Sequence, residues 1–279
     1  MRRTMKAGWS LFKVRTAEGL QYRLAALSGV TVSVFWVLIE VAVLTVFFTY
    51  GNREPDSSVN GMTLAQAISY RWIGELMYGL VAAGVEGGIR DKITSGDIGI
   101  ELIRPLDLYW HWFARTSAGS ISNLVMRGGL TVTCGALISL IGFRGMGLGL
   151  PASPLYFCLF LISTLGAILF GTAYCMFLAT VRANVAWGDG PVNLINVTGM
   201  ILSGGFLPLQ LWPDFMQTFL RLQPFASYYD TPAKLYAGTI AVEDGLRSLL
   251  VQVLWIAAFI ALGKVILKRK IKTVVVQGG

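Results

Sequence analysis

Four charged side chains lie within long apolar stretches of the sequence: Glu40, Arg71, Glu75 and Arg127. If these stretches form membrane helices, the rise of about 1.5 Å per residue puts Glu40 and Glu75 at similar depth, with Arg71 one turn from Glu75. Charges inside a membrane are costly unless they are paired. We therefore predict a network of Glu40, Arg71 and Glu75, with Arg127 nearer the bilayer centre. All four are candidates for lining a pathway through the membrane.

Two interpretations of this network remain open on the sequence. In one, the charges line an inner cavity and contact a transported molecule; in the other, an ion pair only fixes the register of the helices. A charge-neutral substitution of Glu40 would separate them. Normal assembly with altered transport would favour the cavity, whereas loss of assembly would favour the structural ion pair.

Motifs for enzymatic chemistry are absent from the sequence. It contains no phosphate-binding loop of the form GxxxxGKS or GxxxxGKT, no HExxH and no GxSxG. The single histidine, His111, excludes a multi-histidine metal site, and Cys134, Cys158 and Cys175 have neither zinc nor redox spacing. The sequence therefore predicts that this chain is not itself an enzyme and binds no metal or cofactor.

Composition favours a polytopic membrane protein of the all-α class. Hydrophobic types make up 54% of the 279 residues and charged types 14%, and the mean hydropathy is +0.62. A soluble domain of this size could not bury such an apolar excess, and a disordered chain would be far more polar. A bilayer core needs about 20 apolar residues per helix. We predict one transmembrane domain over 1–279 with six helices, at 24–50, 64–85, 116–143, 154–181, 190–213 and 248–267.

The basic residues predict how the chain is oriented. Hydropathy alone leaves the 64–85 stretch open, because it contains Arg71 and Glu75. With that stretch counted as a span, sixteen Lys and Arg lie on one side and five on the other. This bias places both termini in the cytoplasm. It also accounts for the net charge of +8 without nucleic acid as a partner.

Two cytoplasmic segments have distinctive patterns. Residues 1–23 place Trp9 and Phe12 near one helical face beside lysines, which predicts an amphipathic helix in the membrane interface, the alternative being a solvated basic tail. In the loop 87–112, Ser95 or Asp97 can cap a short helix that stops before Pro105. That helix is equally compatible with a docking element and with an ordinary connection.

The segment 204–245 is rich in proline, with Pro208, Pro213, Pro224 and Pro232. It reads as a broken helix end, a short amphipathic helix and a second break. The apolar residues between the breaks predict short helices that re-enter the membrane from outside, where irregular backbone must be buried or line a wet cavity. The alternative is an external cap with no transport role.

These features, in this order, resemble the permease subunit of ABC transporters of the type-2 (ABC-2) exporter class, and within it a bacterial branch. The resemblance depends on the loop sequence SGDIGIELIRPLDLY and on the later sequence SGGFLPLQLWP. The loop pattern is formed here by Gly96, Asp97, Leu102, Arg104, Pro105 and Asp107.

The resemblance implies a coupling helix over 97–104 that seats in a groove of a separate ABC ATP-binding subunit. Glu101 then joins the pattern residues as a coupling candidate, and ATP and Mg belong to the partner ATPase. The broken outer segment would close the pathway from outside; the gate candidates are Gly204, Gly205, Pro208, Pro213 and Pro224. The resemblance also implies pairing with a second permease copy or a sister permease in the bacterial cytoplasmic (inner) membrane.

A different class of function remains as an alternative. The chain could be a secondary transporter or channel subunit driven by an ion gradient. Co-purification of an ATPase would separate this alternative from the exporter permease.

Overall fold

The computed structural model describes residues 23–50, 58–82, 107–142, 145–184 and 190–271. Within these ranges the chain is mostly helical and forms no strand; a single β-bridge joins Val59 and Met62. The elements are α2 (Arg23–Thr49), α3 (Leu64–Ala82), α6 (Leu108–Asn123), η1 (Leu124–Gly129), α7 (Leu130–Leu140), α8 (Pro154–Asn184), α9 (Gly190–Leu202), η2 (Leu209–Leu211), α10 (Asp214–Leu222), η3 (Pro224–Ser227), α11 (Asp230–Ala237) and α12 (Val242–Ile271).

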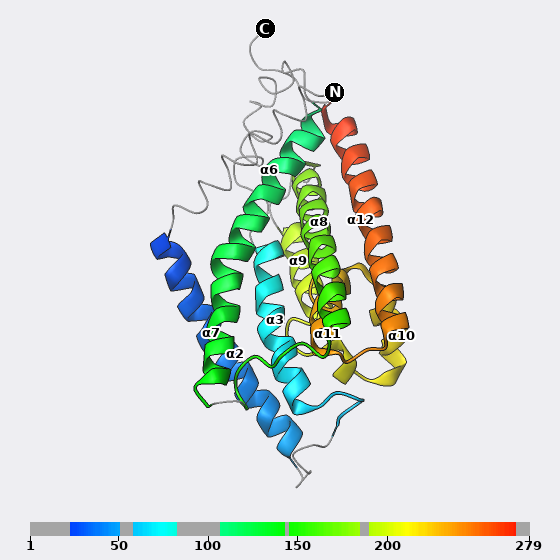
Figure 1. Ribbon diagram of the computed structural model, residues 1–279. Helices are drawn as coiled ribbons and strands as arrows, with labels where there is room; N and C mark the ends of the chain where they lie inside the picture. The colour runs from blue at the N-terminus through cyan, green and yellow to red at the C-terminus, as the bar shows by residue number, and fades with distance from the viewer. Residues whose placement is uncertain (1–22, 51–57, 83–106, 143–144, 185–189, 272–279) are drawn as a thin grey trace.

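The long helices run side by side in alternating directions, with α6, η1 and α7 forming one continuous rod (Figure 1). Four segments are long and apolar enough to cross a membrane: Ser28–Thr49, Leu108–Leu140, Pro154–Arg182 and Val242–Arg269. Helix α3, with 19 residues, is long enough but not apolar enough to be among them, and α9, with 13 residues, is apolar but shorter. The chain is therefore a helical protein with several apolar helices of membrane-spanning length, and the count of six spans stays a prediction.

Several helices have bounds that differ from those of the predicted spans; α12, for example, extends past both ends of 248–267. The helix predicted at 116–143 begins at Leu108, because the Asp107 carboxylate caps it by accepting a hydrogen bond from the Trp110 amide (3.1 Å). The span predicted at 190–213 ends as a helix at Leu202. The chain turns there through Gly204, whose φ of +90° is incompatible with a continuing α-helix.

Helix α3 lies in the middle of the described bundle. It packs against α2, α6, α7, α8 and α11, and it buries Tyr70, Trp72, Ile73, Met77 and Leu80. A helix surrounded by protein does not need a lipid-facing apolar surface. This position explains why α3 tolerates Arg71 and Glu75 and why its hydropathy is lower than that of the outer helices.

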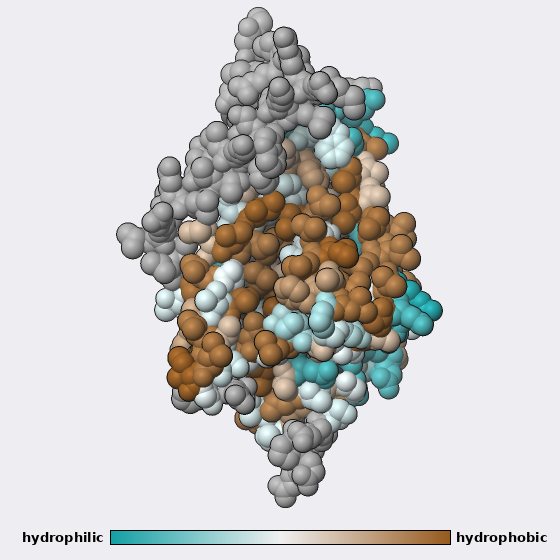
Figure 2. All heavy atoms as spheres, viewed as in Figure 1, coloured by the Kyte–Doolittle hydropathy of each residue, from teal (hydrophilic) through white to brown (hydrophobic). Residues whose placement is uncertain are grey.

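Lipid-compatible surface is most evident on α2. One face of α2 is buried through Val37, Val41 and Leu44, whereas Phe35, Val43 and others on the opposite face are exposed. Figure 2 shows hydrophobic side chains over the middle of the face in view, with hydrophilic ones gathered toward both ends of α12. This distribution is what a bilayer-spanning protein requires.

Helices α8 and α12 form the longest packed pair, and Gln252 joins them to η3. The Gln252 side-chain nitrogen donates hydrogen bonds to the Ser163 carbonyl (3.0 Å) and the Ser227 carbonyl (2.6 Å), and the residue is fully buried. The amide thereby satisfies carbonyls from two other elements inside an apolar region, which strengthens each bond.

Replacing Gln252 with leucine is expected to destabilise the protein by about 1–3 kcal/mol, because two buried carbonyls lose their donor. The measurement is the apparent Tm of the purified protein in detergent. Leu254→Val, on the exposed face of the same helix, is the control and should leave the Tm unchanged. Equal Tm values for Gln252→Leu and the control would contradict the proposed role.

Candidate functional site

The four intramembrane charges predicted from the sequence meet in one pocket. Glu40 comes from α2, Arg71 and Glu75 from α3, and Arg127 from η1, and all four line a cavity of about 340 Å³. The spacing of Arg71, Glu75 and Tyr78 repeats once per helical turn, so α3 presents all three to the same cavity. The pocket holds two positive and two negative side chains and is charge-balanced.

Arg71 is the most heavily bonded of the four. It forms an ion pair with Glu40, and its Nη1 donates hydrogen bonds to the Gly205 carbonyl (2.8 Å) and to the Tyr229 hydroxyl. The Arg71 side chain is 3% exposed. Its guanidinium therefore ties α2, the turn after α9 and the start of α11 to α3, and it has no free surface for a ligand.

Arg127 is held more loosely. Its Nε donates a hydrogen bond to the Ser33 hydroxyl (2.9 Å), and its Nη2 lies 3.6 Å from a Glu75 carboxylate oxygen. The 3.6 Å separation is an ion-pair contact longer than a hydrogen bond. The Arg127 side chain is 30% exposed, against 6% for Glu75. The sequence predicted a network of Glu40, Arg71 and Glu75; in the structure Arg71 pairs with Glu40, whereas Glu75 contacts Arg127.

Arg127 lies in a π-helical turn. Residues Leu124–Gly129 form this turn in the middle of the rod made by α6 and α7. Single π-turns within α-helices are rare and occur frequently at functional sites. This turn packs closely on α3, because a Cβ added at Gly128 would lie 2.6 Å from the Leu76 side chain.

Tyr70 and Asp230 form a second buried connection next to Arg71. The Tyr70 hydroxyl donates a hydrogen bond to the Asp230 carboxylate (2.8 Å) and lies 3.4 Å from the Gly204 carbonyl. The consecutive pair Tyr70 and Arg71 on α3 therefore faces the consecutive pair Tyr229 and Asp230 at the start of α11. Tyr70 and Arg71 also contact the carbonyls of the turn at 204–205, and we call this set of six residues the clasp.

Gly204 is required at the centre of the clasp for two reasons. Its φ of +90° is a backbone conformation that L side chains rarely adopt. A Cβ at this position would also lie 2.2 Å from the Tyr70 hydroxyl oxygen. The close approach of the turn to α3 thus depends on the absence of a side chain.

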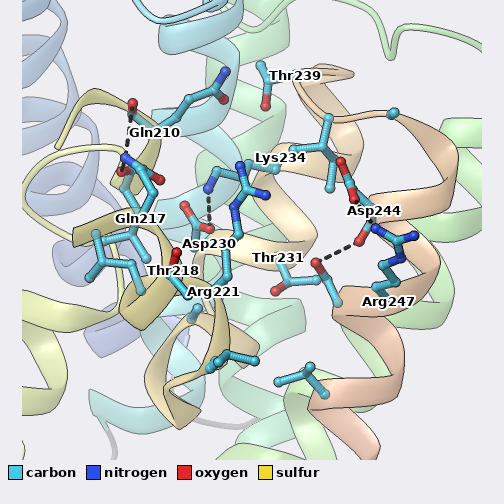
Figure 3. A pocket seen from close by; sticks show the side chains of 18 of the residues that line it. Gln210, Gln217, Thr218, Arg221, Asp230, Thr231, Lys234, Thr239, Asp244 and Arg247 are labelled. Carbon is cyan, nitrogen blue, oxygen red and sulfur yellow. Dashed lines mark hydrogen bonds and ion pairs between the residues drawn. The ribbon is translucent and has the colours of Figure 1, made fainter. Parts of the chain in front are cut away.

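The clasp adjoins a larger polar pocket of about 630 Å³ lined by η2, α10, α11 and the start of α12. Asp230 belongs to both the clasp and this pocket: its second carboxylate oxygen is 2.7 Å from the Lys234 Nζ. Figure 3 shows this ion pair within the pocket, together with Arg221 and the exposed pair Arg247 and Asp244. We call this cavity the polar pocket and the smaller one the charged pocket.

Of the five predicted gate residues, Gly205 lines the charged pocket, and the other four line neither pocket. Gly204 and Gly205 lie in the clasp; buried Pro208 precedes η2, Pro213 precedes α10, and Pro224 begins η3. Each proline begins or precedes a short helix, where its fixed φ and missing amide hydrogen are tolerated. The predicted breaks therefore coincide with the helix starts in this region.

Most of the predicted coupling residues lie outside the described part of the chain. These are Gly96, Asp97, Glu101, Leu102, Arg104 and Pro105, as well as the amphipathic segment 1–23 except for its last residue, which begins α2. Asp107 is described, and it caps α6. Its coupling role stays a prediction, alongside this structural one.

Sequence reasoning missed the clasp residues Tyr70, Tyr229 and Asp230, and it missed Ser33. Tyr70 and Asp230 are 160 positions apart, and no local sequence pattern predicts a hydrogen bond between them. The sequence did offer one signal. Tyr229 and Asp230 follow the break at Pro224, and the start of a buried helix is expected to carry polar partners.

Comparison with known proteins identifies the family. Residues 34–278 match the family described as ABC-2 family transporter protein, so the match begins within α2 and includes every residue that lines the two pockets except Val32. No curated protein matches the chain. The family is a membrane component of transport, as the charged pocket inside an apolar bundle would lead one to expect. The chain belongs to the ABC-2 family of transporter proteins.

Proposed function

We propose that the chain is the permease subunit of an ATP-driven ABC exporter and forms half of its translocation pathway. The observation that carries this proposal is the charged pocket, which is enclosed by α2, α3, η1 and the turn after α9 and is bounded on one side by the clasp. A permease needs a cavity that accepts a substrate and a removable barrier beyond it. Because the chain belongs to the ABC-2 family, it is expected to work with an ABC ATP-binding partner.

In this proposal the clasp is the outer gate. It separates the charged pocket from the polar pocket by a few side-chain bonds, two of which end on the carbonyls of Gly204 and Gly205 and two on Tyr229 and Asp230. Such bonds can break together if α3 and α11 move apart. The energy for this movement must come from contacts that differ between the closed and the open state of the gate.

Coupling to ATP hydrolysis is assigned to the loop 87–112. Its short helix over 97–104 would dock on a separate ATPase subunit, and two permeases, identical or sister copies, would assemble over two such subunits. Both termini and the coupling loop would lie in the cytoplasm at the bacterial inner membrane. The amphipathic segment 1–23 would lie in the interface and precede α2.

Purification of the tagged chain from its native membrane in mild detergent tests this proposal. We expect an ABC ATPase to co-purify in stoichiometric amount. Arg104→Ala and Asp97→Asn should insert normally but lower the stimulation of ATP hydrolysis by the permease by about 10-fold, since a charged hydrogen bond is worth roughly 1.5–3 kcal/mol.

Arg269→Gln, in the exposed last turns of α12, is the matched control and should leave ATP hydrolysis unchanged. Absence of any ATPase from the purified complex, together with activity that collapses when the ion gradient is dissipated, would establish the secondary-transporter alternative instead. Unchanged coupling in both loop variants would refute the assignment of the docking helix.

A further inference from the structure

The positive charge of Arg127 is the most accessible charge in the charged pocket. Its side chain is 30% exposed, whereas Arg71, Glu40 and Glu75 are 3%, 16% and 6% exposed. Arg71 is already bonded to three groups. A molecule entering the pocket therefore meets a guanidinium before it meets a carboxylate.

The bonding of Arg127 leaves capacity for a ligand. Its Nε is committed to Ser33, but the contact of its Nη2 with Glu75 is 3.6 Å. A guanidinium carries five hydrogens in a planar fork that matches a carboxylate or phosphate. An incoming anion can bind this fork without displacing a short hydrogen bond between Arg127 and Glu75. The Ser33 bond meanwhile holds the guanidinium in place.

Apolar side chains line another part of the charged pocket. Val32 and Trp36 of α2 and Phe206 after α9 line it, and they are 63%, 52% and 55% exposed. Val32, Trp36 and Glu40 are spaced four residues apart, so they follow one another along the same face of α2. A ligand with its charge at Arg127 would thus have its apolar part against this exposed lining.

We propose that the charged pocket binds an anionic amphiphile, with its carboxylate or phosphate on Arg127 and its apolar chain against Trp36 and Phe206. The π-turn that carries Arg127 supports this role, because such turns occur frequently at functional sites. This inference rests on the proposed function only for the statement that the amphiphile is cargo. The binding itself does not depend on an ATPase.

Quenching of Trp36 fluorescence by 9,10-dibromostearate tests the binding directly. The permease is reconstituted without ATPase in nanodiscs of phosphatidylcholine, and the Trp36 signal is the difference between the wild-type chain and Trp36→Phe. We expect saturable quenching that laurate competes away and that dodecyltrimethylammonium, of equal chain length, does not. Equal displacement by the cation would overturn the proposal.

Arg127→Gln should weaken the apparent affinity for dibromostearate at least 10-fold, and Arg127→Lys by less. Because Arg127→Gln leaves Glu75 without its partner, the double variant Arg127→Gln with Glu75→Gln is measured beside it, and both must keep the wild-type Tm. Arg269→Gln is the matched control. An affinity within two-fold of wild type in both Arg127 variants that lack the positive charge would refute the site.

A last arm distinguishes cargo from a resident membrane lipid. The complete complex with its ATPase is trapped with ATP and vanadate, and dibromostearate binding is measured again. Loss of the Trp36 quenching identifies the amphiphile as cargo, and unchanged quenching identifies it as a resident lipid at the same anion site. Failure of an ATPase to co-purify would refute the proposed function while leaving the nanodisc result standing.

Discussion

Replacing Arg71 with leucine is expected to destabilise the protein by about 3–5 kcal/mol, the usual cost of removing one partner from a buried ion pair. Glu40 would lose its ion pair in a position that is only 16% exposed, and the Gly205 carbonyl and Tyr229 hydroxyl would lose a donor. At about 3 °C per kcal/mol for a chain of this size, the apparent Tm should fall by roughly 10 °C. The measurement is thermal unfolding of the purified chain in detergent.

A double variant separates the loss of charge from the loss of packing. In Arg71→Gln with Glu40→Gln neither member of this ion pair carries a charge, so no partner is left buried and unpaired and most of the lost stability should return. ATP hydrolysis by the complex with its ATPase should nevertheless stay impaired, since the bond to the turn at Gly205 is weakened. Full recovery of both stability and ATPase stimulation would show that the ion pair only fixes helix register, the simpler of the two interpretations that the sequence allowed.

Replacing Gly204 with alanine is expected to have the second-largest effect, about 3 kcal/mol. The backbone strain of a side chain at φ +90° adds to the loss of the hydrogen bond between Tyr70 and Asp230, because the new Cβ would force the Tyr70 hydroxyl away. The Tm in detergent should fall by roughly 9 °C. If the clasp is the outer gate, as we propose, ATP hydrolysis should also become less dependent on substrate, because the gate would no longer close.

The neighbouring glycine provides the matched control. Gly205 has no positive φ, and the nearest atoms to an added Cβ are 3.3 Å away, so Gly205→Ala should cost much less. Adding Tyr70→Phe to Gly204→Ala removes the overlapping hydroxyl but not the backbone strain, and should recover only part of the stability. Equal Tm values for the Gly204 and Gly205 variants would contradict the role assigned to the turn.

We could predict from the sequence that the intramembrane charges converge, because the sequence indicates both the energetic cost of each unpaired charge and its depth in the membrane. The need to pair a charge follows from its apolar surroundings, and its depth follows from its position along the helix. Rotation about the helix axis is not readable in the same way. The pairing of Glu75 with Arg127 depends on that rotation, and a π-turn changes the rotation without leaving a composition signal.

Other features escaped prediction for similar reasons. Apolar residues continue past Leu202 to Trp212, so hydropathy extended the fifth predicted span over a turn set by Gly204. The clasp is made by side chains that meet only after the whole bundle has packed, since Tyr70 and Asp230 are 160 residues apart. Helix α3 was doubtful by hydropathy because its neighbours are protein, which the sequence does not display.

The order of the ion pairs along the chain matters for biogenesis. Glu40 of α2 is neutralised by Arg71 of α3, and Glu75 of α3 is neutralised by Arg127 of η1, so each segment supplies the counter-ion of the one made before it. A lone charge costs about 2.5–3.5 kcal/mol when a helix leaves the insertion machinery for lipid. Until α3 has been synthesised, Glu40 bears that cost unpaired, against the gain from the many apolar residues of α2, and the arrival of Arg71 removes the cost.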